Sequence, residues 1–189
     1  MLRTIRRPMM STLITDHKLL RQHARKHVEA GAVTQGYQAG RSDVVRMLNA
    51  ALASELICVL RYRSHYFIAK GIHACTVAAE FLEHSNEELQ HVDWLAERIV
   101  QLGGEPDFSP QGVIERGQSV FGIAVNLYEM IKENLVEERV AIDHYKELLL
   151  FIGDDDPTSS ALIQNILQTE EQHANELASL LWGLPEQHN

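Results

Sequence analysis

Two Glu-x-x-His motifs carry the side chains best suited to chemistry in this 189-residue sequence. Glu88 precedes His91 by three residues, and Glu170 precedes His173 by the same spacing. Residues three apart lie on one face of a helix, so each motif places a carboxylate and an imidazole one turn apart. A single motif of this kind is common on solvated helix faces, and the pair needs support from the rest of the sequence.

Two further glutamates repeat in register with these motifs. Glu55 precedes Glu88 by 33 residues, and Glu138 precedes Glu170 by 32 residues. Glu55 lies within the apolar stretch ALASELICVL, which favours a buried position. In the second half, Glu137 stands next to Glu138 and Glu171 next to Glu170, so the position of each ligand is open by one residue. Symmetry with the first half favours Glu138 and Glu170.

If these four glutamates and two histidines lie inside a folded domain, the four carboxylates carry a large uncompensated negative charge. Burying unpaired charges is costly. Two divalent cations would cancel four carboxylates while the imidazoles stay neutral. One Glu from each of two helices with one Glu-x-x-His from each of two others is typical of di-iron and di-manganese bundles. Mixed carboxylate and imidazole ligands suit iron or manganese. The sequence therefore predicts a two-metal site at Glu55, Glu88, His91, Glu138, Glu170 and His173.

Two tyrosines accompany the predicted ligands. Tyr62 follows Glu55 by seven residues, and Tyr145 follows Glu138 by seven, so each shares a helix face with its glutamate. Either they are core tyrosines, or they hydrogen-bond to ligand carboxylates and orient them. The neighbouring polar residues are expected at the surface, namely Glu83, His84, Glu87, Glu137 and Glu171.

Four long helices are predicted to position these residues, with approximate ranges 42–70, 72–102, 123–152 and 157–182. Ser42 or Asp43 is expected to cap the first helix. Asp156 is expected to cap the fourth, with Pro157 in its first turn. The second helix ends at Gly103-Gly104, a helix-stop signal.

The connections between these helices predict an all-α four-helix bundle. Short loops join the first two helices and the last two, whereas EPDFSPQGVIERGQSVFG is too rich in Gly and Pro for a helix and too long for a tight turn. Two helical hairpins joined by a long crossover are a known bundle topology. A short helix is expected near residues 16–30. We assign residues 1–41 to a basic N-terminal extension, 42–184 to the bundle and 185–189 to a C-terminal tail.

Charge is unevenly spread along the chain, whose net charge is −9. Residues 1–46 hold nine Lys and Arg against three acids, and the remainder holds eight against twenty-three. The acidic body attracts cations, while the basic arm could reach the phosphates of DNA. The alternative is that the arm is a disordered or packing extension, and Met10 could be the true start.

The sequence contains no apolar run of about 20 residues, so no membrane association is expected. The first ten residues lack the apolar stretch of a secretory signal. A cytoplasmic location is therefore predicted.

Over about residues 44–182 the chain resembles the bacterioferritins of the ferritin-like superfamily. The resemblance is carried by MLNAALASELICVLRY, EELQHVDWLAERIVQLGGEP, MIKENLVEER and ILQTEEQHANEL. It implies two iron ions per chain, and Tyr62 matches a tyrosine beside the iron site. The implied ligand roles are bridging for Glu88 and Glu170, and terminal for the pairs Glu55 with His91 and Glu138 with His173.

Two departures from that family shape the expected assembly. Leu89 stands where haem-binding bacterioferritins carry a methionine ligand, so no haem is expected. Only sixteen residues follow His173, too few for the fifth helix of larger ferritin cages. With its N-terminal extension, the chain is similar to the Dps-like group. That similarity implies a homo-oligomer, with a twelve-subunit shell favoured.

The resemblance implies an enzyme, a di-iron ferroxidase that oxidises Fe(II) with O2 or H2O2. Iron sequestration, detoxification and protection against oxidative stress would follow. One alternative is a manganese catalase or another di-metal oxidase or peroxidase. The chain has no CxxC pair for an electron-transfer iron and little extra length for an organic pocket, which weakens that alternative. The other alternative is a non-catalytic DNA-binding or interaction module, which the basic arm favours.

Overall fold

The computed structural model describes residues 16–183, except residues 38, 73, 123 and 125. The chain separates into two compact units, one ending at Gly36 and the other beginning at Tyr37. The first unit contains α1 (His17–Ala24) and a 3₁₀ turn, η1 (Val28–Ala30), in the region where a short helix was expected. The predicted division at residue 41 and the predicted tail at 185–189 remain predictions, and the tail lies outside the described residues.

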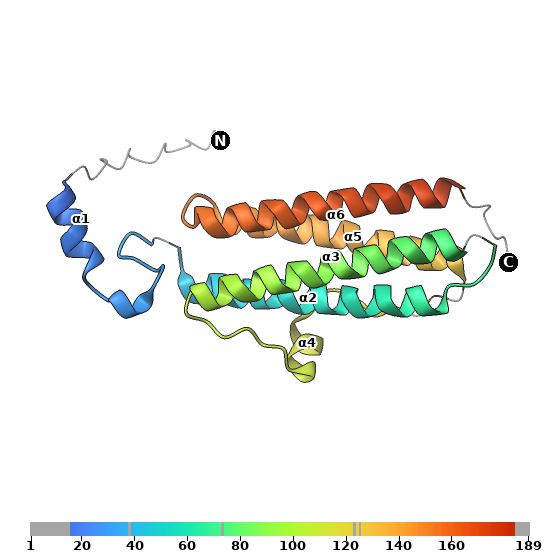
Figure 1. Cartoon of the computed structure of the whole chain (residues 1–189), viewed down its shortest axis with the longest axis horizontal. Coiled ribbons are helices and arrows are strands. Elements are labelled where there is room, and N and C mark those ends of the chain that lie inside the picture. The colour runs from blue at the N-terminus through green and yellow to red at the C-terminus, as the bar shows by residue number, and fades with distance from the viewer. Residues whose placement is uncertain (1–15, 38, 73, 123, 125, 184–189) are drawn as a thin grey trace, which may run out of the picture. The chain divides into compact units, whose positions relative to one another are not determined.

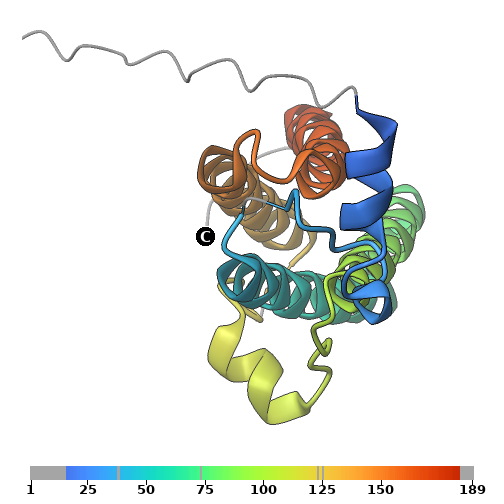
Figure 2. The same ribbon diagram turned by 90° about the vertical axis from the view of Figure 1, so that its left-hand side faces the viewer.

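Four long helices of the second unit form the bundle (Figure 1). They are α2 (Arg41–Ile68), α3 (Ala74–Gln101), α5 (Leu127–Ile152) and α6 (Pro157–Gly183). α2 packs along α3 and α5 along α6, and the two hairpins meet through α3 with α6 and α2 with α5. Figure 2 shows the four helices around a common interior. Every regular element in the described part of the chain is helical, which confirms the predicted all-α class.

The helix ends follow local sequence signals in two places. At the end of α3, the N–H of Gly103 donates to Val100 O at 2.8 Å and the N–H of Gly104 donates to Ile99 O at 2.9 Å. This is a Schellman motif, and it requires the left-handed backbone that Gly103 adopts at φ +72°. At the start of α6, Asp156 Oδ1 accepts from the N–H of Ser159 at 2.9 Å, as the predicted cap requires.

The predicted cap of α2 is wrong. Gly40 is the N-cap residue and has no side chain to cap with, while Ser42 and Asp43 already lie inside the helix. The Asp43 carboxylate instead accepts from Arg46 one turn later, at 3.1 Å. The prediction failed because Ser and Asp both favour the N-cap position, whereas the sequence pattern does not fix the first residue of the helix to within one or two positions.

The crossover was predicted to lack a helix, and this is also wrong. It contains α4 (Pro110–Arg116), which packs against α2 outside the bundle (Figures 1 and 2). Ser109 caps this helix by accepting from the N–H of Gly112, and Pro110 suits its first turn. The third long helix also begins later than residue 123, at Leu127, because Asn126 caps it by accepting from the N–H of Glu129.

Apolar side chains fill the bundle on both sides of its middle. Towards the end where α3 starts, a cluster of buried residues includes Tyr62, Phe81, Ile131 and Leu177. The halves of the helices towards the opposite end bury aliphatic residues such as Leu48, Leu95, Leu148 and Ile163. The middle is therefore enclosed at both ends by apolar side chains, which strengthens electrostatic interactions there.

Within the described part of the chain, the structure has no helix that combines the length and apolarity needed to cross a membrane.

Candidate two-metal site

The structure brings all six predicted residues together in the middle of the bundle. None has more than 2% of its surface exposed. Their ligand atoms form two groups that could each hold a metal ion, with the atoms of each group within 4.8 Å of one another. The first group is Glu55, Glu88, His91 and Glu170, and the second is Glu88, Glu138, Glu170 and His173. Glu88 and Glu170 belong to both groups.

The first imidazole turns its Nδ1 atom toward three carboxylates. His91 Nδ1 lies 3.3 Å from Glu55 Oε2, 3.2 Å from Glu88 Oε2 and 3.0 Å from Glu170 Oε1. These atoms come from three helices, α2, α3 and α6. A metal ion between these atoms could therefore be bound by side chains from both hairpins.

The second imidazole has the corresponding arrangement. His173 Nδ1 lies 3.4 Å from Glu88 Oε1 and 3.8 Å from Glu138 Oε2. Its other nitrogen, Nε2, lies 2.7 Å from Glu87 Oε2. A carboxylate on the far nitrogen fixes the ring orientation, as is usual for histidines that bind metals. Glu87 was expected at the surface, and it is only partly exposed.

Each tyrosine hydrogen-bonds to the glutamate of the opposite hairpin. Tyr62 O–H donates to Glu138 Oε1, and Tyr145 O–H donates to Glu55 Oε1. Both tyrosines are fully buried. The hydrogen-bonding interpretation is therefore the one that the geometry supports, although the partner lies across the bundle rather than on the tyrosine's own helix.

Burial, together with the close approach of other charged and hydrogen-bonding groups, shifts the pKa values of three of these carboxyl groups. Burial raises the pKa of Glu55 to about 8, with a further contribution from Glu88. Burial likewise raises the pKa of Glu170 well above its usual range, followed by repulsion from Glu88 and Glu55. For Glu88, burial favours the neutral acid, but hydrogen bonds from Glu55, His173 and His91 lower its pKa well below the usual range. Glu88 thus holds its negative charge more firmly than Glu55 or Glu170 does.

The two histidines shift in the opposite sense. Burial disfavours their charged form, but hydrogen bonds to Glu55 and Glu88 raise the pKa of His91 to about 10. Hydrogen bonds to Glu138 and Glu88 raise the pKa of His173 to about 12. Without another cation, the surplus negative charge is thus balanced by protons on the imidazoles and carboxyl groups.

Three buried polar atoms at this site make no hydrogen bond of standard geometry within the described residues, although charged neighbours lie close to them: Glu88 Oε1, Glu170 Oε1 and His173 Nδ1. Leaving such atoms unpaired costs about 1–3 kcal/mol each. All three are lone-pair donors of the kind that bind divalent iron or manganese, and all belong to the second group. The residues present therefore fit a pair of divalent cations.

Two residues near the site contradict the expected surface positions. His84 is 1% exposed and Glu137 is 9% exposed. Glu137 lies 3.4 Å from the fully buried Arg61, and their ion pair explains its burial. His84 precedes Glu88 by four residues and so lies on the same face of α3. That spacing was the available signal that His84 faces inward.

The family of Ferritin-like domains matches residues 45–186 of this chain. The chain belongs to the ferritin-like family. The predicted resemblance is confirmed, and iron binding follows from membership of this family.

Ferritin-like relatives are found by sequence as well. A bacterioferritin of Mycobacterium bovis is 28% identical over 143 residues, which cover 75% of this chain and 86% of the relative. A bacterioferritin of Desulfovibrio desulfuricans is 28% identical over 134 residues, 70% of this chain and 71% of the relative.

Solved ferritin-like structures share the fold. A bacterioferritin-related protein of Bacteroides fragilis, described as a dodecameric thioferritin, superimposes with a TM-score of 0.74 at 28% identity. That match covers 77% of this chain and 88% of the other. Dps from Staphylococcus aureus superimposes with a TM-score of 0.73 at 22% identity, covering 76% of this chain and 97% of the other. The Dps match is evidence for the fold alone.

Proposed function

We propose that this protein is a ferroxidase that binds two Fe(II) ions per chain in the bundle and oxidises them with O2 or H2O2. The observation that carries the proposal is the pair of buried ligand groups that share Glu88 and Glu170. Two ions held by common carboxylates lie close enough to give up one electron each to the same oxidant molecule. Paired transfer avoids the release of a one-electron oxygen radical.

The residues have distinct roles in this proposal. Glu88 and Glu170 bind both ions. Glu55 and His91 complete the coordination of one ion, and Glu138 and His173 complete the coordination of the other. Tyr62 and Tyr145 restrain the two terminal carboxylates by hydrogen bonds. Before Fe(II) binds, protons on the histidines and carboxyl groups offset the negative charge of the site. These protons must leave when the ions bind, because the positive charge of the ions replaces that of the protons.

The test is anaerobic titration of the apo-protein with Fe(II), followed by addition of O2 or H2O2. We expect a rise in ferric absorbance that depends on the oxidant and that corresponds to two oxidised irons per chain. The double variant Glu88→Gln/Glu170→Gln should lose this oxidation. Glu83→Gln/Glu171→Gln makes the same charge change at exposed positions of the same two helices and should retain it. Equal oxidation rates in both variants would contradict the proposal.

Manganese is the second candidate metal, because carboxylate and imidazole ligands suit both ions. A manganese site would favour a catalase or another di-metal oxidase. Metal analysis of protein from cells grown without added metal separates the two. Manganese at two ions per chain, with no oxidant-dependent Fe(II) oxidation, would replace the ferroxidase proposal.

We further propose that the protein is a cytoplasmic homo-oligomer that sequesters iron and protects against oxidative stress. The dodecameric assembly of the Bacteroides fragilis relative supports a twelve-subunit shell. A dimer in light scattering would contradict the shell.

The non-catalytic alternative rests on DNA as a partner of the basic arm, and a gel-shift assay tests it. The prediction that no haem binds at Leu89 is checked by the haem absorbance of the purified protein.

A further inference from the structure

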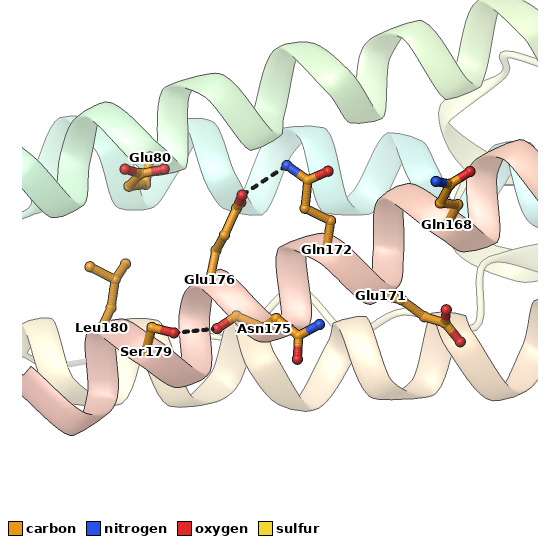
Figure 3. Close-up of a pocket in the computed structure, with 8 residues that line it drawn as sticks. All are labelled: Glu80, Gln168, Glu171, Gln172, Asn175, Glu176, Ser179 and Leu180. Atoms are coloured by element: carbon orange, nitrogen blue, oxygen red, sulfur yellow. Dashed lines mark hydrogen bonds between the residues drawn. The ribbon is translucent and has the colours of Figure 1, made fainter.

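A third group of ligand-type side chains lies beside the two-metal site. Glu80 and His84 of α3 and Glu176 of α6 bring one ligand atom each to within 4.8 Å of one another. Glu80 and Glu176 line a pocket of about 610 Å³, and Figure 3 shows the Glu176 side chain extending from α6 toward α3. His84 is 1% exposed and lies behind these carboxylates. The two-metal site uses none of the three residues.

The hydrogen-bond roles of His84 leave one of its nitrogens as an acceptor. Tyr62 donates its only hydroxyl hydrogen to Glu138, so its oxygen can only accept from His84 Nδ1, which lies 3.3 Å away. A neutral imidazole carries a single N–H, and this contact uses it. Nε2 of the neutral ring is therefore a lone-pair donor directed away from Tyr62.

That lone pair faces a carboxylate. His84 Nε2 lies 2.9 Å from Glu176 Oε2. Two acceptors at this distance repel each other unless a positive species lies between them, and the species is either a proton or a metal ion. Adjacent ligands of a six-coordinate ion with bonds of about 2.1 Å are also about 3 Å apart, so the separation suits a metal.

The surroundings of Glu176 favour the metal. Gln172 Nε2 donates to Glu176 Oε1 at 2.8 Å, which orients the carboxylate (Figure 3). The other carboxylate oxygen, Oε2, faces His84. Glu80 adds a third donor from the opposite helix. The Glu176 side chain is 39% exposed, so water in the pocket can supply the remaining ligands. A carboxylate held by a neighbouring amide is typical of metal ligands.

We propose that Glu80, His84 and Glu176 bind one divalent first-row transition-metal ion, separate from the two-metal site. The His84 ring stacks on His173 with centroids 4.0 Å apart, so this ion lies next to the two-metal site. The inference that Fe(II) occupies it in the cell rests on the proposed ferroxidase function. The existence of the site does not, since it depends only on these three donors.

The test is titration of the apo-protein with Co(II) alone, with binding counted by calorimetry and visible absorbance. We expect wild type to bind one more ion than Glu80→Gln/Glu176→Gln. Glu83→Gln/Glu171→Gln is the matched control, because it removes the same charge from the same helices and Glu171 lines the same pocket. It should bind as many ions as wild type. Circular dichroism confirms that all three proteins are folded.

Two results would overturn the proposal. Equal Co(II) binding by wild type and Glu80→Gln/Glu176→Gln would mean that a proton alone lies between His84 and Glu176. Loss of the same amount of binding in both double variants would mean non-specific attraction to an acidic surface. A separate variant, Glu55→Gln/Glu138→Gln, reports on the two-metal site. If it binds as many ions as wild type, the ferroxidase assignment fails while the third site stands on its own result.

Discussion

Tyr62 of the first hairpin donates its hydroxyl hydrogen to Glu138 of the second hairpin. Tyr145 of the second hairpin returns the relationship by donating to Glu55 of the first. Both hydrogen bonds cross the bundle at the candidate metal ligands. The terminal carboxylate of each ligand group is therefore oriented by a tyrosine of the other hairpin.

Removing one of these hydroxyls should weaken the site. In Tyr62→Phe, Glu138 Oε1 loses its donor and the carboxylate can rotate. We expect metal affinity or Fe(II) oxidation rate to fall by about 10- to 100-fold, the usual effect of losing a partner that orients a metal ligand. Calorimetry and stopped-flow absorbance measure the two quantities. Tyr66→Phe, on the same helix, is the control, and a loss as large in that variant would argue against a specific role for Tyr62.

The shared and unshared glutamates should behave differently. Glu170 belongs to both ligand groups, whereas Glu55 belongs to one. We expect Glu170→Gln to lose two bound ions relative to wild type and Glu55→Gln to lose one. Counting Co(II) ions by calorimetric titration gives the comparison. The loss of a single ion in both variants would show that Glu170 does not serve both groups.

A buried ion pair at the start of α6 should stabilise the bundle. Asp156 accepts from Arg98 Nη2 at 2.8 Å, from Tyr37 O–H at 2.9 Å and from the Ser159 backbone N–H at 2.9 Å. Asp156→Ala leaves the Arg98 charge buried without its partner and removes the helix cap. We expect the free energy of unfolding to fall by about 3–5 kcal/mol.

Urea denaturation measures this change, and Asp155→Ala is its control. Asp155 is exposed in the same turn, so its removal should change stability by less than about 0.5 kcal/mol. A similar small change for Asp156→Ala would contradict a stabilising role for the pair with Arg98.

Stability should depend on pH through His65. Burial, together with the nearby Arg61 charge, lowers the pKa of His65 from its ordinary value of 6.5 to about 4. The unfolded chain therefore takes up a proton first as pH falls. The contribution of neutral His65 is complete above pH 6.5 and is lost progressively between pH 6.5 and about 4.

The variant His65→Gln isolates this effect, because glutamine can still bond to Asn134, the partner of His65 Nδ1 at 3.1 Å, but does not titrate. The slope of unfolding free energy against pH should be smaller in the variant by up to about one proton between pH 6.5 and 4. Parallel curves for the two proteins over that range would rule out the role of His65.

The sequence predicted the helices and the six candidate ligands because both depend on regular spacing. A period of 3.6 places Glu88 and His91 on one face, and the match between the two halves selects Glu138 over Glu137. Spacing along one helix says nothing about which residue lies across the bundle. Tyr62 was therefore matched with Glu55, its neighbour on α2, and not with Glu138.

Two other features lay beyond that reasoning for physical reasons. α4 depends on a local cap at Ser109 and on packing against α2, which outweigh the Gly and Pro content of the crossover. The spacing of His84 from Glu88 could have placed it on the inward face of α3, but its partners Tyr62 and Glu176 come from two other helices that only the folded chain brings near it.

Anomalous diffraction from crystals soaked anaerobically with Fe(II) tests the central claim most directly. We predict two iron peaks inside the bundle, both adjacent to Glu88 and Glu170, one next to His91 and the other next to His173. A single peak, or iron confined to the protein surface, would contradict a two-metal site formed by these six residues.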